Sequence, residues 1–241
     1  MKKLGLGILI GIVILVISGI AAANPNPAAN KPTEPLEKMI FIHYKDGTVK
    51  GGGGAATAAT CYKLLGAKWK SLPVSYVINP NDYNVKFVTG AISASTAEWD
   101  SHTSVNLFSG YSINTSATWD DTVDKVDYKN EYVFGAYPDS NVIAVTVVWY
   151  IRYSMQIVDY DVLFNTSYYT WKDCSLGTNC SAAMDLQNIA THETGHGVGL
   201  ADIYSSSCSA VTMYGYSNYG ETQKRTLGQP DIKGLQTLYG K

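Results

Sequence analysis

The 241-residue sequence has little charge, little histidine and little cysteine. Only 16% of its residues are charged and the formal net charge is −2, so we expect no basic surface for nucleic acid or an anionic membrane. None of its four cysteines has the close paired spacing of a zinc ribbon, which argues against that kind of structural metal site. The chain also has only four histidines, and two of them, His192 and His196, are four residues apart.

The strongest pattern in the chain is the string HETGHGVGLAD, which contains those two histidines. On a helix, His192 and His196 lie on one face, where both imidazoles reach one cation. Glu193 follows the first histidine, where its carboxylate is placed to take a proton from a metal-activated water as a general base. Gly199 favours the left-handed turn that ends a helix and brings Asp202 back to the metal. Three protein ligands with a fourth position for water indicate a catalytic zinc site.

A competing interpretation is a non-catalytic surface or adhesion module that keeps the metal for stability. A structural zinc site is closed by four ligands and has no need of a base. The presence of Glu193 therefore favours an enzyme, namely a zinc-dependent endopeptidase that acts on protein or peptide substrates.

The first 23 residues predict export from the cytoplasm. A basic start, Met1-Lys2-Lys3, precedes an uncharged run that ends in three alanines, the small residues typical of a signal-peptide cleavage site. The run is about 20 residues long and would span a bilayer if it were not cleaved. We therefore expect a secreted, extracellular protein, or one anchored to the outer face of the cell membrane through this segment.

The even number of cysteines in an exported chain predicts two disulfides, with three possible connectivities. We favour a bond between Cys174 and Cys180, which closes a short loop just before the metal-binding helix. The other bond would then join Cys61 to Cys208 and tie the start of the catalytic domain to the loop after Asp202.

Residues 24–60 are rich in proline and glycine and predict a linker, with a short pro-segment as an alternative. They include an apolar run of strand length, Leu36–Tyr44, which contains His43. A histidine there could occupy the zinc in a latent form, but an ordinary, partly buried strand histidine is the commoner case. His102 lies in a polar stretch and indicates no function. We expect the catalytic domain to comprise residues 61–241.

Hydrophobic periodicity predicts an α+β fold for that domain. The expected strands are Trp69–Ile78, Ser104–Phe108, Asn141–Ile151 and Ile157–Phe164, and the expected helices are Val85–Trp99, Ala183–Gly197 and Pro230–Tyr239. The continuous β-branched run Asn141–Ile151 is typical of a strand at the sheet centre. Alternating polar residues in Ile157–Phe164 favour an edge strand, to which an extended peptide substrate could add.

Four aspartates between the second and third expected strands form an acidic loop: Asp120, Asp121, Asp124 and Asp127. The simplest interpretation is a solvated loop. A Ca²⁺ site is the alternative, because calcium prefers carboxylate oxygen ligands.

The motif HExxHxxGxxD, followed by a methionine in VTMY, resembles the metzincin zinc peptidases over roughly Lys63–Tyr239. Within that clan, KWKSLPVSYVIN, the step Met213-Tyr214 and PDIKGLQTLYG resemble the matrixins, whereas the aspartate as third ligand is similar to snapalysin. The resemblance implies a mixed, mostly parallel five-stranded sheet with an active-site helix and a C-terminal helix. It also implies that Met213 supports the site from beneath the zinc. We expect a monomer.

The sequence departs from the matrixin pattern in several places. Matrixins usually have histidine at the position of Asp202. The chain also lacks their inhibitory PRCGxPD cysteine. It lacks the histidines that bind a second zinc in matrixins, so we predict one catalytic Zn²⁺. Pro230 replaces the first of two aspartates, which leaves Asp231 to contact the turn around Met213. Tyr214 and Tyr216 are expected in the pocket; a transition-state role for Tyr216 is weaker than a place in the cleft wall.

Overall fold

The computed structural model describes residues 35–46, 61–175 and 178–241. The predicted signal segment, residues 1–23, and most of the predicted linker lie outside these ranges. Within them, no helix is both long and apolar enough to cross a membrane.

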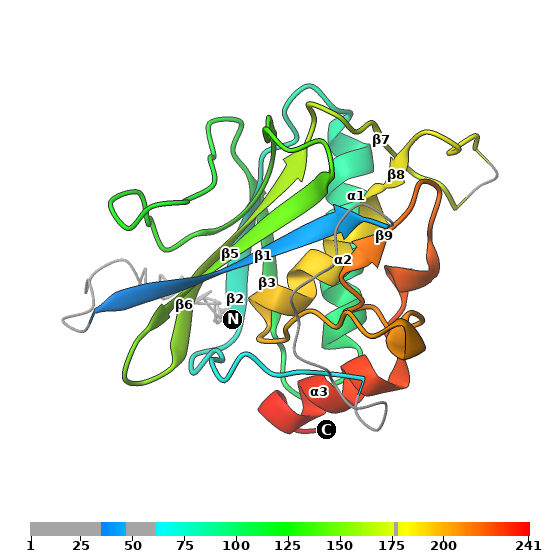
Figure 1. Cartoon of the computed structure of the whole chain (residues 1–241). Coiled ribbons are helices and arrows are strands. Elements are labelled where there is room, and N and C mark those ends of the chain that lie inside the picture. Colours follow the sequence, from blue (N-terminus) through cyan, green and yellow to red (C-terminus); the bar gives the residue numbers. More distant parts are fainter. Residues whose placement is uncertain (1–34, 47–60, 176–177) are drawn as a thin grey trace, which may run out of the picture.

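One twisted sheet forms the centre of the molecule (Figure 1). Its seven strands lie in the order β3 (Phe108–Ile113), β2 (Val74–Ile78), β4 (Asn130–Gly135), β6 (Gln156–Asn165), β5 (Val142–Ile151), β1 (Leu36–Lys45) and β9 (Tyr216–Ser217). The pairs from β3 to β6 are parallel, β5 is antiparallel to both β6 and β1, and β1 is parallel to β9. The first five strands in this order are the predicted mixed, mostly parallel sheet, so the expected α+β fold is confirmed.

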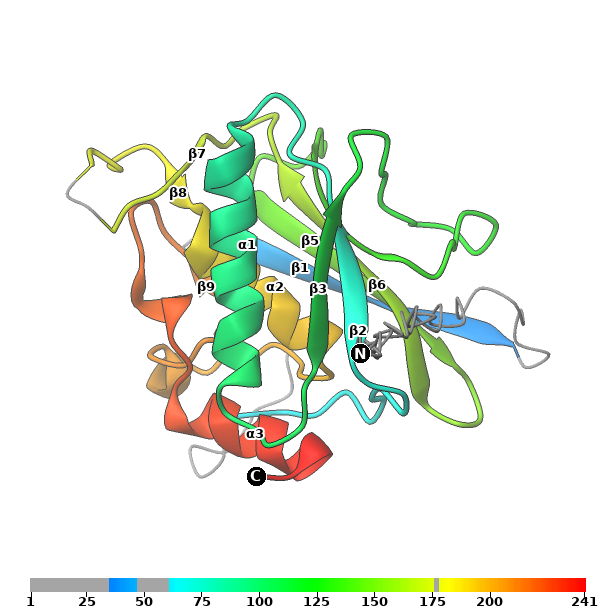
Figure 2. The ribbon, with the colours of Figure 1, turned by 180° about the vertical axis from the view of Figure 1, so that it is seen from behind.

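Three α-helices accompany the sheet: α1 (Val85–Asp100), α2 (Leu186–Gly197) and α3 (Gln229–Tyr239). They match the predicted helices within a few residues. Asn84 caps α1 by accepting a hydrogen bond from the backbone of Phe87 (3.0 Å), and Asp185 caps α2 in the same way. Figure 2 shows α1 and α2 against one face of the sheet, and the buried indole of Trp99 in α1 donates to the Thr191 carbonyl of α2 (2.9 Å). The helix that carries the predicted ligands His192 and His196 is therefore held between α1 and the sheet.

Shorter elements complete the described part of the chain. These are the paired strands β7 (Trp171–Lys172) and β8 (Met184–Asp185), and the short 3-10 helices η2 (Ser206–Cys208) and η3 (Gln223–Arg225).

The predicted edge strand was wrong. β6 lies at the middle of the sheet, between β4 and β5, and it is β5 that would form the edge of the five-stranded sheet. The polar positions that suggested an edge are Asp159 and Asp161, and both are fully buried. They alternate with apolar residues because their carboxylates accept hydrogen bonds from backbone groups inside the protein.

Two other predicted strands had the wrong bounds. β3 begins at Phe108, where we expected a strand to end, and β2 comprises only the second half of the predicted Trp69–Ile78. The missing half makes tertiary contacts instead: the Trp69 indole donates to the Gly197 carbonyl (2.8 Å) at the end of α2.

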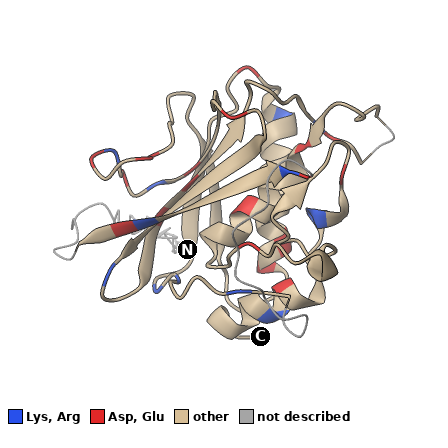
Figure 3. Cartoon of the chain, viewed as in Figure 1, with Lys and Arg blue, Asp and Glu red and all other residues tan. Residues whose placement is uncertain are grey.

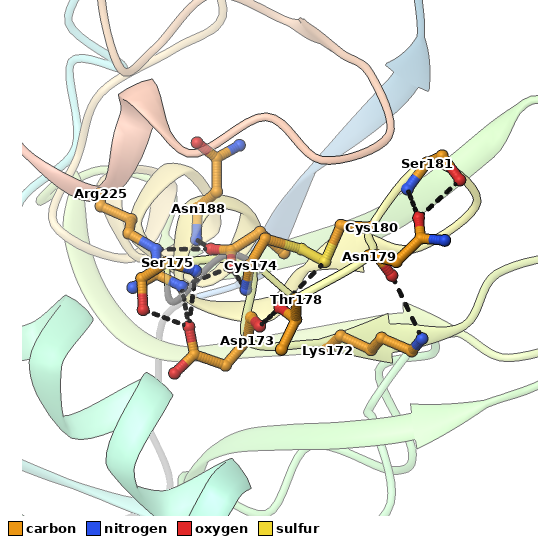
Figure 4. Close-up of a disulfide and its surroundings, with 11 residues drawn as sticks. Lys172, Asp173, Cys174, Ser175, Thr178, Asn179, Cys180, Ser181, Asn188 and Arg225 are labelled. Carbon is orange, nitrogen blue, oxygen red and sulfur yellow. Dashed lines mark hydrogen bonds and ion pairs between the residues drawn. A yellow bond between two sulfur atoms is a disulfide. The ribbon is translucent and has the colours of Figure 1, made fainter.

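The structure has the two disulfides that we favoured, Cys61–Cys208 and Cys174–Cys180. Figure 4 shows the second of these and the polar contacts around it. The Cys174 backbone donates to Asp185, the residue that caps α2 (2.8 Å), and Arg225 forms ion pairs with Asp185 and Asp173. The disulfide loop is thereby joined to the start of the metal-binding helix.

Candidate active site

Helix α2 and the turn after it bring the three predicted metal ligands together. Gly199 has φ +104°, and a Cβ there would lie 2.8 Å from the Ala67 carbonyl oxygen, so glycine is required. The turn places Asp202 Oδ1 3.0 Å from His192 Nε2 and 3.4 Å from His196 Nε2. These ligand atoms all lie within 4.8 Å of one another, which one ion can bridge.

The hydrogen bonds of these residues fit a metal ion. His192 Nδ1 donates to the Thr212 carbonyl and His196 Nδ1 to the Leu200 carbonyl, both at 2.8 Å. Since a carbonyl oxygen only accepts, each Nδ1 carries the proton and each Nε2 offers a lone pair. Within the described residues, His192 Nε2 and Asp202 Oδ1 are buried without a hydrogen-bond partner. Burial also lowers the pKa of His192 to about 4, so that ring is neutral at neutral pH. Two nitrogens and one oxygen are donors that zinc accepts.

Asp202 receives a further contact that the sequence did not reveal. The Tyr204 hydroxyl donates to Asp202 Oδ2 (3.0 Å), which leaves Oδ1 facing the histidines. Burial raises the pKa of Tyr204, so the phenol keeps its proton and can donate. Its spacing, two residues after the aspartate, was the only signal available in the sequence.

Glu193 is fully buried beside the ligands. Its Oε2 accepts a hydrogen bond from Thr146 Oγ1 on β5 (2.5 Å), and its Oε1 lies 2.9 Å from His43 Nδ1 on β1. Burial raises the pKa of Glu193. A carboxylate with a raised pKa is a stronger base, as proton abstraction from water requires.

Met213 is fully buried and lies against α2, the helix that carries His192 and His196. A Cβ on Gly195 of α2 would come within 2.2 Å of the Met213 sulfur, so the glycine permits this close approach. Asp231 at the start of α3 accepts hydrogen bonds from the backbones of Thr212 (2.8 Å) and Met213 (3.2 Å). The predicted contact between Asp231 and this turn is therefore present in the structure.

The two tyrosines expected in the pocket lie on the same side of the site as Asp202. The Tyr216 ring, on β9, is centred 5.3 Å from that of Tyr204 and 5.5 Å from that of Tyr214. Tyr216 is only 9% exposed, as expected for part of a wall.

Two aromatic residues of β1 also reach the ligands. The His43 ring is centred 3.9 Å from that of His192, and Phe41 stacks on His196 with centroids 4.1 Å apart and planes at 12°. Our expectation of an ordinary strand histidine missed the contact of His43 with Glu193. No local pattern reveals it, because the partners are 150 residues apart in sequence.

A second polar cluster lies on β6, β4 and the loop before β4. The carboxylates form two groups, and within each group the oxygens lie within 4.8 Å of one another. One group is Asp120, Glu131 and Asp161, and the other is Asp120, Asp127 and Asp159. Asp161 accepts hydrogen bonds from the backbones of Asp120 (2.7 Å) and Glu131 (2.9 Å), whereas Asp159 Oδ1 is buried without a partner among the described residues. We call these five residues the carboxylate cluster.

The carboxylate cluster corrects our interpretation of the acidic loop. Asp120 is buried, and Asp127 is partly buried and forms an ion pair with Lys129. Asp121 and Asp124 are not part of the cluster; Asp121 forms a surface ion pair with Lys125 (2.5 Å). Figure 3 shows how few charged residues lie on the visible strands, which makes a buried carboxylate group unusual in this sheet. Burial raises the pKa of Asp159 and of Asp161 well above the usual range, and it raises that of Glu131 to about 7.

The metzincin class of zinc peptidases is defined by three features that this site combines. These are a helix with two imidazoles and a carboxylate, a glycine turn that brings back a third ligand, and a methionine packed against that helix. Residues 68–240 match the Matrixin family model, and the chain belongs to the matrixin family. Matrilysin from Homo sapiens is 46% identical over 72 residues, which are 30% of this chain and 24% of matrilysin. Neutrophil collagenase from Homo sapiens is 43% identical over 63 residues, 26% of this chain and 13% of the collagenase. Each match thus spans a quarter or less of the relative.

Proposed function

We propose that this matrixin is an exported zinc endopeptidase in which His192, His196 and Asp202 hold one catalytic Zn²⁺ and Glu193 is the general base. The observation that carries the proposal is the convergence of three buried ligand atoms, two of them without hydrogen-bond partners, beside a buried carboxylate. The matrixin family supports the same class of activity. We expect the substrate to be a protein or a peptide, and we expect the enzyme to act as a monomer.

The residues around the metal site have separate roles in this proposal. Bound zinc would supply Lewis acidity and lower the pKa of a coordinated water towards about 7. Glu193 would accept the proton of the attacking water and pass it to the leaving amine. The hydrogen bond from Thr146 holds one oxygen of that carboxylate, and the other lies 2.9 Å from His43 Nδ1. Asp202 brings a negative charge where most matrixins have an imidazole, and the Tyr204 hydroxyl draws part of that charge away.

The carboxylate cluster supports a Ca²⁺ ion as a second cofactor. Calcium binds six to eight oxygen ligands, mostly carboxylates and carbonyls. Four of the five acidic side chains are buried, and they need either a cation or protons to offset their charge. The partnerless oxygen of Asp159 supplies a ligand that hydrogen bonds have not used.

The expected location remains as the sequence predicts it: secreted, or anchored at the outer face of the membrane by residues 1–23. The two disulfides are consistent with an oxidising compartment. N-terminal sequencing of the mature protein distinguishes the two locations.

Replacement of the base tests the proposed activity directly. Glu193→Gln should keep bound zinc but reduce kcat/KM on a fluorogenic peptide by roughly 10²–10⁴-fold, the usual contribution of a general base. Asp124→Asn, a matched acid-to-amide change outside the site, should leave both quantities unchanged. Metal analysis of each variant separates loss of zinc from loss of the base. If Glu193→Gln hydrolyses the peptide at the rate of the unchanged chain, Glu193 is not the base; if no form hydrolyses it and chelation only destabilises the fold, the non-catalytic module is the better account.

A further inference from the structure

Strand β1 covers the edge of the sheet next to the candidate active site. It pairs with β5 from Leu36, opposite Ile151, to Tyr44, opposite Val142, and its end pairs with β9. Both Figure 1 and Figure 2 show β1 beside β5, and it ends close to α2. An extended peptide binds a sheet edge through the same main-chain groups that β1 already uses. A substrate and β1 therefore compete for one edge.

The inward face of β1 also covers the catalytic residues themselves. Phe41 stacks on His196 and the His43 ring lies against His192. His43 Nδ1 bonds to Glu193 Oε1, while Thr146 occupies Oε2, so both oxygens of the proposed base are engaged. While His43 donates to Oε1, this hydrogen bond competes with the water from which Glu193 would take a proton.

A chain of buried hydrogen bonds holds His43 in this place. Since the Glu193 carboxylate accepts, His43 Nδ1 donates, and His43 Nε2 accepts from Ser217 Oγ on β9 (3.0 Å). Lys224 Nζ in turn donates to Ser217 Oγ (2.6 Å), to the Tyr216 carbonyl (2.6 Å) and to Glu221 (2.5 Å). Lys224 is only 1% exposed. The network continues from η3 through β9 to His43, so β1 is fixed by specific contacts as well as by strand pairing.

We propose that β1 is a built-in inhibitor strand, which occupies the position of a substrate chain and uses His43 to engage the general base. This inference rests on the proposed peptidase function, because a strand that binds Glu193 inhibits the protein only if Glu193 is the general base of a peptidase. The strand belongs to the same chain as the site, and a covalent connection gives it a high effective concentration there. β1 must leave the edge of β5 before a substrate binds.

Weakening β1 without touching the metal ligands tests the proposal. His43→Ala should raise kcat/KM of the full-length, zinc-loaded chain on a fluorogenic peptide about tenfold or more, and His43→Gln should give a smaller increase because an amide can still bond to Glu193. Ile40→Ala is the matched control, since that side chain is 49% exposed on the opposite face of the same strand, and it should change kcat/KM less than twofold. An unchanged or lower kcat/KM in His43→Ala, with zinc retained, would make β1 a permanent part of the enzyme and overturn the proposal.

A second measurement does not depend on turnover. A peptide hydroxamate that binds zinc should displace β1, so hydrogen exchange of residues 36–45 should become faster at saturating hydroxamate. If the hydroxamate binds while residues 36–45 stay protected, the inhibitor-strand proposal is wrong. If β1 is displaced but no variant hydrolyses peptide, β1 does cover the ligand-binding edge and it is the proposed peptidase function that fails.

Discussion

The candidate zinc site and the carboxylate cluster are two polar clusters that are built in opposite ways. At the candidate zinc site, two imidazoles share the ligand set with one carboxylate, and each ring is oriented by a hydrogen bond to a backbone carbonyl. The carboxylate cluster has five acids, held mainly by backbone N–H groups. The first cluster has one carboxylate among its three ligand residues, whereas the second consists of acids alone and must bind protons or a cation.

Because of this difference, we expect loss of zinc and loss of calcium to have different effects on activity and stability. The proposed zinc ligands lie on a helix and a turn that are already fixed by packing, by Gly199 and by the hydrogen bonds of Asp231 to the turn around Met213. Loss of zinc should therefore remove activity and leave the fold largely intact. Loss of calcium should instead leave repelling charges on β6 at the centre of the sheet and reduce stability.

The largest expected effect comes from removal of a zinc ligand. His196→Ala should reduce kcat/KM by roughly 10³-fold or more, because both the metal and the water that it activates are lost. The variant should bind much less than one zinc per chain and still bind calcium. Asp159→Asn should show the reverse, with zinc retained and calcium affinity reduced. Metal analysis and thermal unfolding of the two purified variants check both statements; equal loss of both ions in either variant would mean that the clusters are not independent.

A smaller but distinctive effect is expected for stability against pH. The pKa of Glu131 is raised to about 7 in the folded chain, above its ordinary value of 4.5. A raised folded pKa contributes stability that is present below the unfolded pKa and lost as pH rises through the folded value, so without calcium the melting temperature should fall between about pH 4.5 and pH 7. Bound calcium favours the ionised carboxylates and should remove this decline. Melting curves across that range, with calcium and with a calcium chelator, measure the difference.

The comparison between Glu131→Gln and the unchanged chain sharpens that test. The amide cannot ionise, so the variant should lose part of the decline of melting temperature with pH in chelator. If the melting temperature of the unchanged chain also stays constant across this pH range, with and without calcium, the carboxylate cluster neither binds calcium nor destabilises the fold through its charge.

The parts of this molecule that could be predicted from sequence are the local ones. The spacing of His192, Glu193 and His196 is set within one turn of helix, and Gly199 is the residue that the reversal requires, so the order of the residues already implies the geometry. The helices α1 and α3 follow from apolar periodicity, and α2 follows from the spacing of its two histidines. The aspartate contact to the turn around Met213 came from the family resemblance.

The errors arose where partners are far apart in the chain. Alternating polar residues indicate one solvent-facing side of a strand, but Asp159 and Asp161 alternate because their side chains lie inside a shared polar cluster with residues of another loop. Likewise, nothing near His43 in sequence shows that β1 adds to β5 and faces Glu193. Strand order and pairing depend on contacts across more than a hundred residues, and a single sequence does not display them.

The smallest effect that we predict concerns Tyr204, which connects the wall of the zinc site to its third ligand. Tyr204→Phe removes only the hydroxyl that donates to Asp202 Oδ2 and leaves the ring against Tyr216. Loss of an outer contact to a metal ligand typically weakens metal binding by 10–100-fold, so zinc affinity in competition with a chelator should fall within that range. The melting temperature of the metal-free chain should change little, because the ring packing remains. Tyr214→Phe, which alters a neighbouring ring without that hydrogen bond, is the control. If both variants bind zinc as tightly as the unchanged chain, the turn at Gly199 is sufficient to orient Asp202 and the hydrogen bond from Tyr204 is not needed.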